Sequence, residues 1–137
     1  MHYNPIETRI VAKFNVTNTS IATQIIGYPS VNQFSEIEID GIVQPSVTTT
    51  YTFNSTGEHI IKYTLVDPTR IGDYAFYNCS TLKKITIPNS ITLIGNNAFD
   101  TCRILNDIIL PDNITAIGGY AFQNCYELTS INIPSKV

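Results

Sequence analysis

Three cysteines recur at intervals of 23 residues, and they are the side chains of this sequence with the most intrinsic reactivity. They are Cys79, Cys102 and Cys125. Metal and redox sites usually hold cysteines in close pairs such as C-x-x-C, whereas each of these stands alone. Because free cysteine is among the most buried residue types, we interpret all three as buried structural thiols. The alternatives are a disulfide between neighbouring copies and a reactive thiol.

A histidine could serve as the general base of a nucleophilic enzyme, but the sequence contains only two. His2 lies in the terminal tail, and His59 follows a turn and is expected to decorate a strand. A serine or cysteine nucleophile needs such a base within hydrogen-bond reach, and no companion motif accompanies either histidine. We therefore predict a protein that is not an enzyme and has no catalytic residues.

Three acidic residues alternate along one segment and form a candidate cation site. Glu36, Glu38 and Asp40 would share one face of a strand, opposite Ile37 and Ile39. Calcium favours such oxygen clusters, but the Asp-x-Asp-x-Asn loop of a calcium site is missing. We interpret the row as a solvated strand face and predict neither a metal nor a cofactor.

Composition narrows the remaining classes of function. Of the 137 residues, 43% are hydrophobic and only 14% are charged, against about 25% charged in a typical soluble domain. The net charge is −3 and no basic cluster exceeds Lys83-Lys84, so we expect neither nucleic-acid binding nor a polybasic membrane anchor. No apolar run is long enough to span a bilayer, so we expect no membrane insertion. No signal peptide is visible at the N-terminus.

The elements that must position these side chains are set by an internal repeat. The copies cover residues 71–93, 94–116 and 117–137. They read IGDYAFYNCSTLKKITIPNSITL, IGNNAFDTCRILNDIILPDNITA and IGGYAFQNCYELTSINIPSKV. Self-similarity at a period between roughly 20 and 50 residues indicates stacked repeats. Such stacks usually present a binding surface and not a pocket for chemistry.

Each recurring position of the repeat has a physical meaning. A glycine recurs near the start of each copy, where it suits a sharp bend or a close approach of two backbones. These glycines are Gly72, Gly95 and Gly118. The pair Ala75-Phe76 and its equivalents are expected in a helical or turn segment that packs inward. The pattern Leu-x-x-Ile-x-Ile/Leu-Pro then predicts a strand in every copy, which the proline ends.

Residues 1–68 do not follow the repeat and read as about six short strands. Apolar and polar residues alternate over 10–16, and Asp40-Gly41 supplies the positive-φ pair of a hairpin turn. Such strands predict a small β-sandwich-like domain over 1–68, followed by repeats over 69–137. A bare end of a repeat stack exposes its core, so we expect this domain to cap the first repeat in a mainly β fold.

The exposed strand positions of the repeats are the candidate ligand surface. If Ile85 and Ile87 point inward, the residues between and beside them point outward. Taken over the three copies, these positions are Lys84, Thr86, Asp107, Ile109, Ser130 and Asn132. Lys84 and Asp107 would be neighbours on stacked strands and would form an exposed pair of opposite charge.

The shared pattern I-G-x-x-A-F-x-x-C-x-x-L-x-x-I-x-I-P-x-x-I-T closely resembles the BspA-like class of leucine-rich repeats, over residues 71–137. The resemblance implies a curved solenoid with a parallel β-sheet on its concave face. It also implies a surface or secreted protein of the kind that bacteria and some protozoan parasites use for adhesion to host proteins. In the N-terminal half, YTFNSTGEHIIKYTLVD is similar to the last hairpin of a PKD or immunoglobulin-like module.

Together these observations predict a non-enzymatic binding or adhesion module of a bacterial cell-surface or secreted protein. Its ligand would be a protein or a glycan, such as an extracellular molecule of a host. The alternative is a structural spacer or scaffold region without a ligand of its own. The third repeat stops at Val137 without a capping sequence, which predicts a fragment of a longer repeat protein. The exposed repeat edge also makes a dimer possible.

Overall fold

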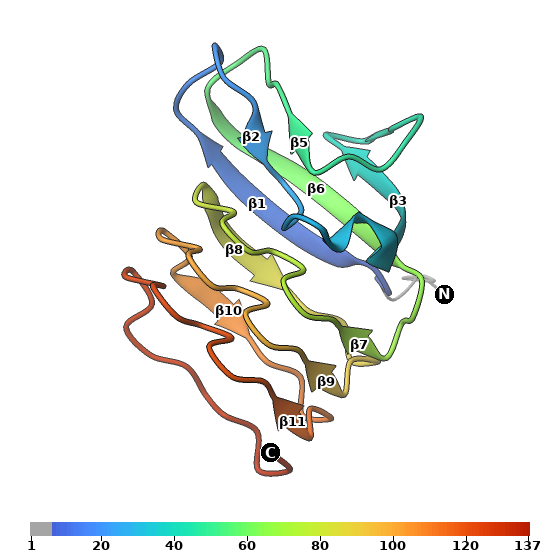
Figure 1. Ribbon diagram of the computed structural model, residues 1–137, viewed down its shortest axis with the longest axis vertical. Coiled ribbons are helices and arrows are strands. Elements are labelled where there is room, and N and C mark those ends of the chain that lie inside the picture. Colours follow the sequence, from blue (N-terminus) through green and yellow to red (C-terminus); the bar gives the residue numbers. More distant parts are fainter. Residues whose placement is uncertain (1–6) are drawn as a thin grey trace, which may run out of the picture.

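The computed structural model describes residues 7–137, and its regular structure is almost entirely β (Figure 1). The one helical element in this range is a short 3-10 helix, η1, over Ser30–Gln33. Six strands precede the repeats, and Asp40 and Gly41 take positive φ angles of 48° and 84° between the third and fourth strands. The mainly β fold and the Asp40-Gly41 hairpin are therefore confirmed.

The largest sheet has six strands and runs through both halves of the chain. Its strands are β1 (Ile10–Val16), β3 (Phe34–Ile39), β4 (Ile42–Val43), β6 (Gly57–Leu65), β8 (Leu82–Thr86) and β10 (Asp107–Ile109). Their order is β10-β8-β1-β6-β3-β4. The two repeat strands β10 and β8 are parallel, and every other pair is antiparallel. The first strand of the chain thus joins the repeats to the rest of the N-terminal part.

Two smaller sheets complete the architecture. The parallel sheet β7-β9-β11 stacks one short strand from the start of each repeat: β7 (Arg70–Ile71), β9 (Leu93–Ile94) and β11 (Ala116–Ile117). The antiparallel pair β2 (Thr23–Gln24) and β5 (Thr50–Tyr51) lies in front of β1 and β6 in Figure 1. The N-terminal part therefore has two layers, as a sandwich-like arrangement requires.

One hydrophobic core lies behind the six-stranded sheet and extends from the N-terminal part into the repeats. Alternate residues of β1 are buried, as its pattern predicts. The rings of Phe76, Phe99 and Phe122 stack with centroids 5.4 Å apart at each step. Phe34 from β3 contacts Phe76 at a centroid distance of 5.8 Å, so N-terminal and repeat side chains pack in the same cluster. The predicted division at residue 68 stays a prediction.

The segments around the Ala-Phe pairs are turns, and they pack inward as expected. Backbone hydrogen bonds join these segments from each repeat, here called a coil, to the next. Phe76 N–H donates to the Ala98 carbonyl, and Phe99 N–H donates to the Ala121 carbonyl, both at 2.8 Å. The expected close approach at the repeat glycines is also present. A Cβ atom at Gly95 would lie 2.6 Å from the Asp73 nitrogen, which leaves no room for a side chain.

The N-terminal part caps the first coil through a loop that replaces the missing preceding repeat. In the later coils the glycine N–H donates to a carbonyl of the coil before, as Gly95 does to Ile71. In the first coil, Gly72 N–H donates instead to Oε1 of Gln33 at 2.8 Å, and Nε2 of Gln33 donates to the Asp73 carbonyl at 2.8 Å. The backbone N–H of Gly27 donates to the Ala75 carbonyl at 2.8 Å. These three hydrogen bonds join the N-terminal part to the backbone of the first coil and so make the predicted cap.

The third repeat departs from the predicted pattern. Residues 128–134 form no strand, although the sequence predicts one there. The strand shortens from five residues in β8 to three in β10, and it is absent from the outermost coil, which no further coil covers. Ile133 is correspondingly 54% exposed. The strand prediction is therefore wrong for the third repeat, and the curvature that the resemblance implies stays a prediction.

Candidate binding surface

The outward face of the six-stranded sheet, here called the open face, carries two rows of side chains that cross the strands. The first row consists of direct partners in register: Ile109, Thr86, Val11, Lys62 and Glu38. The second row consists of Asp107, Lys84, Lys13 and Ile60. Each row begins on repeat strands and continues on N-terminal strands, so both halves of the chain build one surface.

Four of the six predicted surface residues lie together on this face. Lys84 Nζ lies 3.5 Å from a carboxylate oxygen of Asp107, with side chains 47% and 49% exposed. The predicted exposed pair of opposite charge is therefore confirmed. Thr86 stands beside Ile109, which is 77% exposed. Ser130 and Asn132 are also exposed, but no ladder bonds hold them to this sheet.

The sequence did not reveal the N-terminal half of the open face. A shallow cavity of about 210 Å³ is lined by Val11, Lys13 and Ile60 together with Lys84 and Thr86. The period-2 pattern of residues 10–16 indicates that Val11 and Lys13 point outward. It carries no information on which strand lies next to β1. The missing signal was therefore the pairing of β1 with β8.

Ion pairs give the N-terminal part of the open face a mixed charge. Lys62 lies 3.4 Å from Glu7, and Lys13 lies 3.5 Å from Glu58. Arg9 bridges Glu7 at 2.9 Å and Glu38 at 3.3 Å. The hydrogen bond from Arg9 lowers the pKa of Glu7 to about 2. Partly exposed pairs of this kind add little stability, but they fix charges of both signs on the surface.

One cluster has the spatial arrangement of a catalytic triad, with His59 between Ser55 and Asp40. The sequence did not indicate this cluster. His59 Nδ1 lies 2.6 Å from an Asp40 oxygen, and Nε2 lies 3.3 Å from the Ser55 hydroxyl. Nε2 is closer, at 2.8 Å, to the Ser55 carbonyl, which can only accept a hydrogen bond. An Nε2 that donates to this carbonyl has no lone pair left to take a proton from serine. The arrangement therefore indicates a structural role and not a nucleophile. We call the hydrogen bonds of His59 to Asp40 and to the Ser55 carbonyl the clip.

The clip favours the protonated form of His59. Burial by itself lowers the pKa of His59, but the hydrogen bonds to Asp40 and to the Ser55 carbonyl outweigh it and raise the pKa above its ordinary value. The side chain is only 9% exposed and packs against Phe53 at a ring distance of 4.4 Å. His59 belongs to a strand as expected, but it is buried and does not decorate the surface.

The three cysteines are free thiols, and two of them are fully buried. Cys102 donates its thiol proton to the Phe76 carbonyl at 3.2 Å, and Cys125 donates to the Phe99 carbonyl at 3.1 Å. Each of these two thiols is thus hydrogen-bonded to the coil before its own. Burial raises the pKa of Cys125 to about 11 and raises those of Cys79 and Cys102 further. The interpretation as buried structural thiols is confirmed for Cys79 and Cys102, and Cys125 is partly exposed.

The acidic row is engaged in protein contacts and not arranged around a cation. Glu38 pairs with Arg9, and Asp40 pairs with His59. Over residues 7–137, no group of three or more His, Cys, Asp or Glu side chains is placed to hold a metal ion. Within the same range, no helix has the length and apolar character needed to cross a bilayer. His2 lies outside the described residues.

Comparisons with known proteins agree with the repeat pattern. The family model of the BspA type leucine rich repeat region, with six copies, matches residues 46–137. The match begins before the first repeat and includes β5 and β6. The search of curated proteins found no match.

Two solved structures resemble the chain. A leucine-rich repeat protein of T. pallidum is 38% identical over 48% of this chain and 31% of its own, with a TM-score of 0.47. A leucine-rich repeat protein of Bacteroides ovatus is 34% identical over 64% of this chain and 21% of its own, with a TM-score of 0.49. The chain thus spans less than a third of either protein. Since the family model matches about two thirds of the sequence, the chain belongs to the BspA-type leucine-rich repeat family.

Proposed function

We propose that the chain is a non-enzymatic binding module of a bacterial cell-surface or secreted protein, and that its partner docks on the open face. The observation that carries the proposal is the continuity of this face across five strands, from Ile109 to Glu38. Stacked repeats work through such extended surfaces. Members of the BspA type are typically surface or secreted proteins, which supports the location.

The chemistry of the open face fits a protein partner better than a glycan. It presents Ile109 and Ile60, 77% and 43% exposed, among lysines and carboxylates. Protein interfaces combine apolar contacts with charges that set orientation and specificity. The described residues of this face include no exposed aromatic ring on which a sugar could stack. A protein with a complementary mixed-charge surface is therefore the favoured ligand.

The test is binding of this chain to a panel of extracellular-matrix proteins and glycans. Wild type is compared with a triple variant, Lys84→Ser, Asp107→Ser and Ile109→Thr, whose changes are all at exposed positions. The proposal predicts binding to at least one protein and at least a tenfold loss in the variant, the scale of a few removed contacts. Unchanged binding, or no binding across the panel, would favour the spacer alternative.

A further inference from the structure

A second surface lies on the opposite side of the core from the open face and carries exposed aromatic rings. It follows the three coil turns, over residues 72–78, 95–101 and 118–124. The buried Ala-Phe pair of each turn packs in the same core as the inward side chains of the strands, so the residues that flank each pair point away from it. Four tyrosines are exposed here: Tyr28, Tyr74, Tyr77 and Tyr120. We call the surface that carries them the tyrosine surface.

Hydrogen bonds hold Tyr28 against the first turn, although it comes from the N-terminal part. The backbone N–H of its neighbour Gly27 donates to the Ala75 carbonyl at 2.8 Å. The hydroxyl of Ser30 donates to the Asp73 carbonyl, also at 2.8 Å. The segment that carries Tyr28 therefore runs antiparallel to the first turn, and Tyr28 lies beside the turn tyrosine that stands between these two acceptors.

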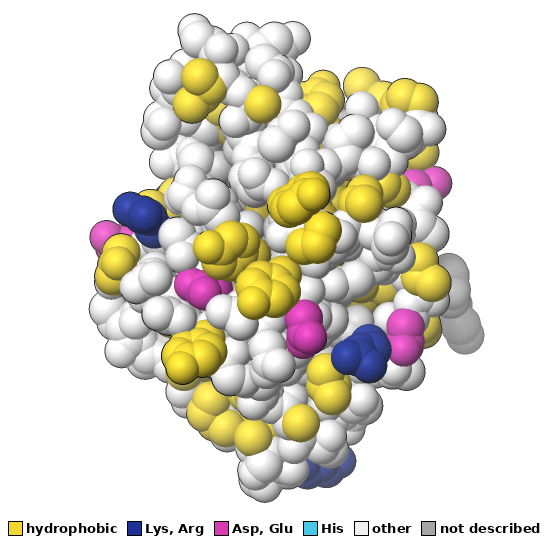
Figure 2. Space-filling model, viewed as in Figure 1, with side chains coloured by type: hydrophobic (Ala, Val, Ile, Leu, Met, Phe, Trp, Pro, Cys, Tyr) yellow, Lys and Arg dark blue, Asp and Glu magenta, His cyan; other side chains and the backbone are white. Residues whose placement is uncertain are grey.

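The other three rings continue the surface across the coils. The rings of Tyr74 and Tyr77 meet edge to face at a centroid distance of 5.5 Å. Tyr120 is the equivalent of Tyr74 two coils on, about 10 Å away at about 4.8 Å for each step. Figure 2 shows hydrophobic side chains gathered near the middle of this side of the molecule, with acidic groups among them. The four tyrosines therefore form one surface that spans the N-terminal part and all three coils.

Stacking of the coils does not require aromatic residues at these positions. The second coil has Asn97 where the first and third have Tyr74 and Tyr120, and it has Asp100 where the first has Tyr77. Over residues 7–137, the hydroxyl groups of the four tyrosines donate to no other protein group, unlike two tyrosines elsewhere in the chain. The four rings thus expose apolar faces and unused polar tips, and side chains of this kind are enriched at protein interfaces.

The same turns contain two carboxylates and neither lysine nor arginine. Asp73 is exposed and accepts from Asn96 N–H through Oδ1 at 2.7 Å, which leaves Oδ2 without a partner among the described residues. Asp100 is only 6% exposed. Its carboxylate accepts from the Asn97 amide at 2.8 Å and from the Thr101 hydroxyl at 2.9 Å. Both donors are neutral, so the negative charge of Asp100 is not cancelled.

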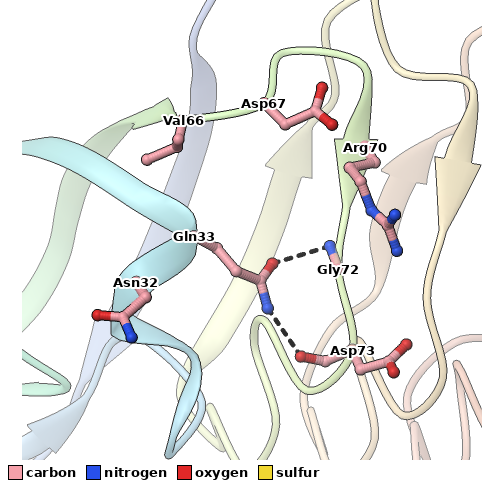
Figure 3. A pocket seen from close by; sticks show the side chains of 7 residues that line it. All are labelled: Asn32, Gln33, Val66, Asp67, Arg70, Gly72 and Asp73. Atoms are coloured by element: carbon pink, nitrogen blue, oxygen red, sulfur yellow. Dashed lines mark hydrogen bonds between the residues drawn. The ribbon is translucent and has the colours of Figure 1, made fainter.

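Basic residues at the margins do not reverse this charge. Figure 3 shows Arg70 and Asp73 beside a cavity of about 320 Å³ that Asp67 also lines, so two carboxylates accompany one guanidinium there. At the other margin Arg103 is accompanied by Glu127, whose N–H donates to the Arg103 carbonyl at 3.3 Å. The tyrosine surface and its margins are therefore negative as a whole.

We infer that the tyrosine surface binds a segment of a partner protein that presents arginine side chains. A guanidinium plane stacks on the face of a tyrosine ring, which attracts cations, and Oδ2 of Asp73 can accept a charge-assisted hydrogen bond from it. Asp100 adds to the attraction through its field, because a buried charge is screened less than an exposed one. An acidic partner would be repelled by both carboxylates. A purely apolar partner would bury the tyrosine hydroxyls and Asp73 without hydrogen bonds, which is costly.

The experiment titrates the whole chain with the peptide acetyl-Arg-Gly-Arg-Gly-Arg-amide and follows the NMR shifts of the tyrosine rings. Peptides with Lys or with Glu in place of Arg are the matched contrasts. The variants copy the second coil, which guards the fold: a double variant Tyr74→Asn and Tyr120→Asn, as in Asn97, and a single variant Asp73→Asn, as in Asn96. The Arg peptide should bind more tightly than the Lys peptide, since a planar guanidinium stacks better, and the Glu peptide should not bind.

The double variant should bind the Arg peptide about tenfold more weakly, the effect of one or two cation–π contacts. Asp73→Asn should bind it about threefold more weakly, because an exposed ion pair contributes less. A rise in salt from about 0.05 M to about 0.5 M should weaken binding by wild type, which purely apolar docking would not do.

The open-face triple variant serves as the control and should bind the Arg peptide as wild type does. This separates the inference from the proposed function, since each surface has its own variants and probes. The inference is overturned if the Arg peptide does not bind at millimolar concentration, if the Glu peptide binds as tightly, or if the double variant binds as wild type does. Sedimentation velocity of the same proteins tests the other occupant: a dimer of wild type that the double variant converts to a monomer would assign the surface to a second copy of the chain and also overturn the inference.

Discussion

At the scale of single residues, the repeat depends on two left-handed backbone positions in each coil. The first is held by Tyr74, Asn97 and Tyr120, and the second by Asn78, Thr101 and Asn124. Asparagine tolerates this conformation, whereas a β-branched residue is strained in it. Thr101, with φ of 63°, is therefore a weak point of the second coil.

Replacing Thr101 by Asn should stabilise the protein. The change relieves left-handed strain of about 1 kcal/mol and loses one partly buried hydrogen bond, from the Thr101 hydroxyl to Asp100 at 2.9 Å. We expect a net gain of about 0.5 kcal/mol in the free energy of unfolding, measured by urea titration. The reverse change, Asn124→Thr, is the matched control and should destabilise. A less stable Thr101→Asn variant would contradict this reading of the turn.

The clip at His59 predicts a pH dependence of stability. Because folding raises the pKa of His59, its contribution is fully present below the unfolded pKa of about 6.5 and is lost as the pH rises through the folded value. The protein should therefore unfold at a lower urea concentration at about pH 8.5 than at about pH 5.5. In His59→Gln this difference should shrink, since no charge is left to titrate. An equal pH dependence in both proteins would rule out the charged clip.

At the scale of elements, the sequence predicted the strands β1 and β8 and the stacking of β8 beside β10, but not the pairing of β1 with β8. Alternation in residues 10–16 and the Ile-x-Ile motif at Ile85 identify strands and their buried faces. Periodicity reports the environment of each side chain and not the identity of the neighbouring strand. The pairing of β1 with β8, which builds the open face, is a long-range contact that no local pattern encodes. The contact of Gln33 with Gly72 was missed for the same reason, because η1 reaches the first coil from a distant part of the chain.

The cap on the first coil depends on Gln33. Gln33→Ala removes the acceptor of Gly72 N–H and the donor to the Asp73 carbonyl, so we expect a loss of about 1–3 kcal/mol in the free energy of unfolding. The amide of Gly72 should also exchange with solvent faster. Asn32→Ala is the matched control, because this neighbouring side chain makes no such bond, and it should change stability by less than about 0.5 kcal/mol. Equal stability of both variants would disprove the capping role.

At the scale of the whole molecule, the core is shared and the repeats should not fold without the N-terminal part. Residues 69–137 alone would expose the Phe76 ring face that Phe34 and Tyr63 cover and the edge of β8 that pairs with β1. Such a fragment should aggregate or stay unfolded. Circular dichroism during heating is the measurement, with the full chain as the control. A cooperative melt of the fragment would show that the repeats are an independent domain.

Because the two halves share one core and one sheet, we propose that one binding surface runs through both of them. The most direct measurement compares two variants of the open face. Each is tested for binding to the extracellular-matrix protein of the panel that the wild-type chain binds. One variant carries Lys13→Ser and Ile60→Ser on the N-terminal strands, and the other carries Lys84→Ser and Ile109→Thr on the repeat strands. If the partner contacts both halves of the open face, each variant should bind at least tenfold more weakly, because each loses central contacts. Full binding by either variant, or no binding by wild type, would contradict it.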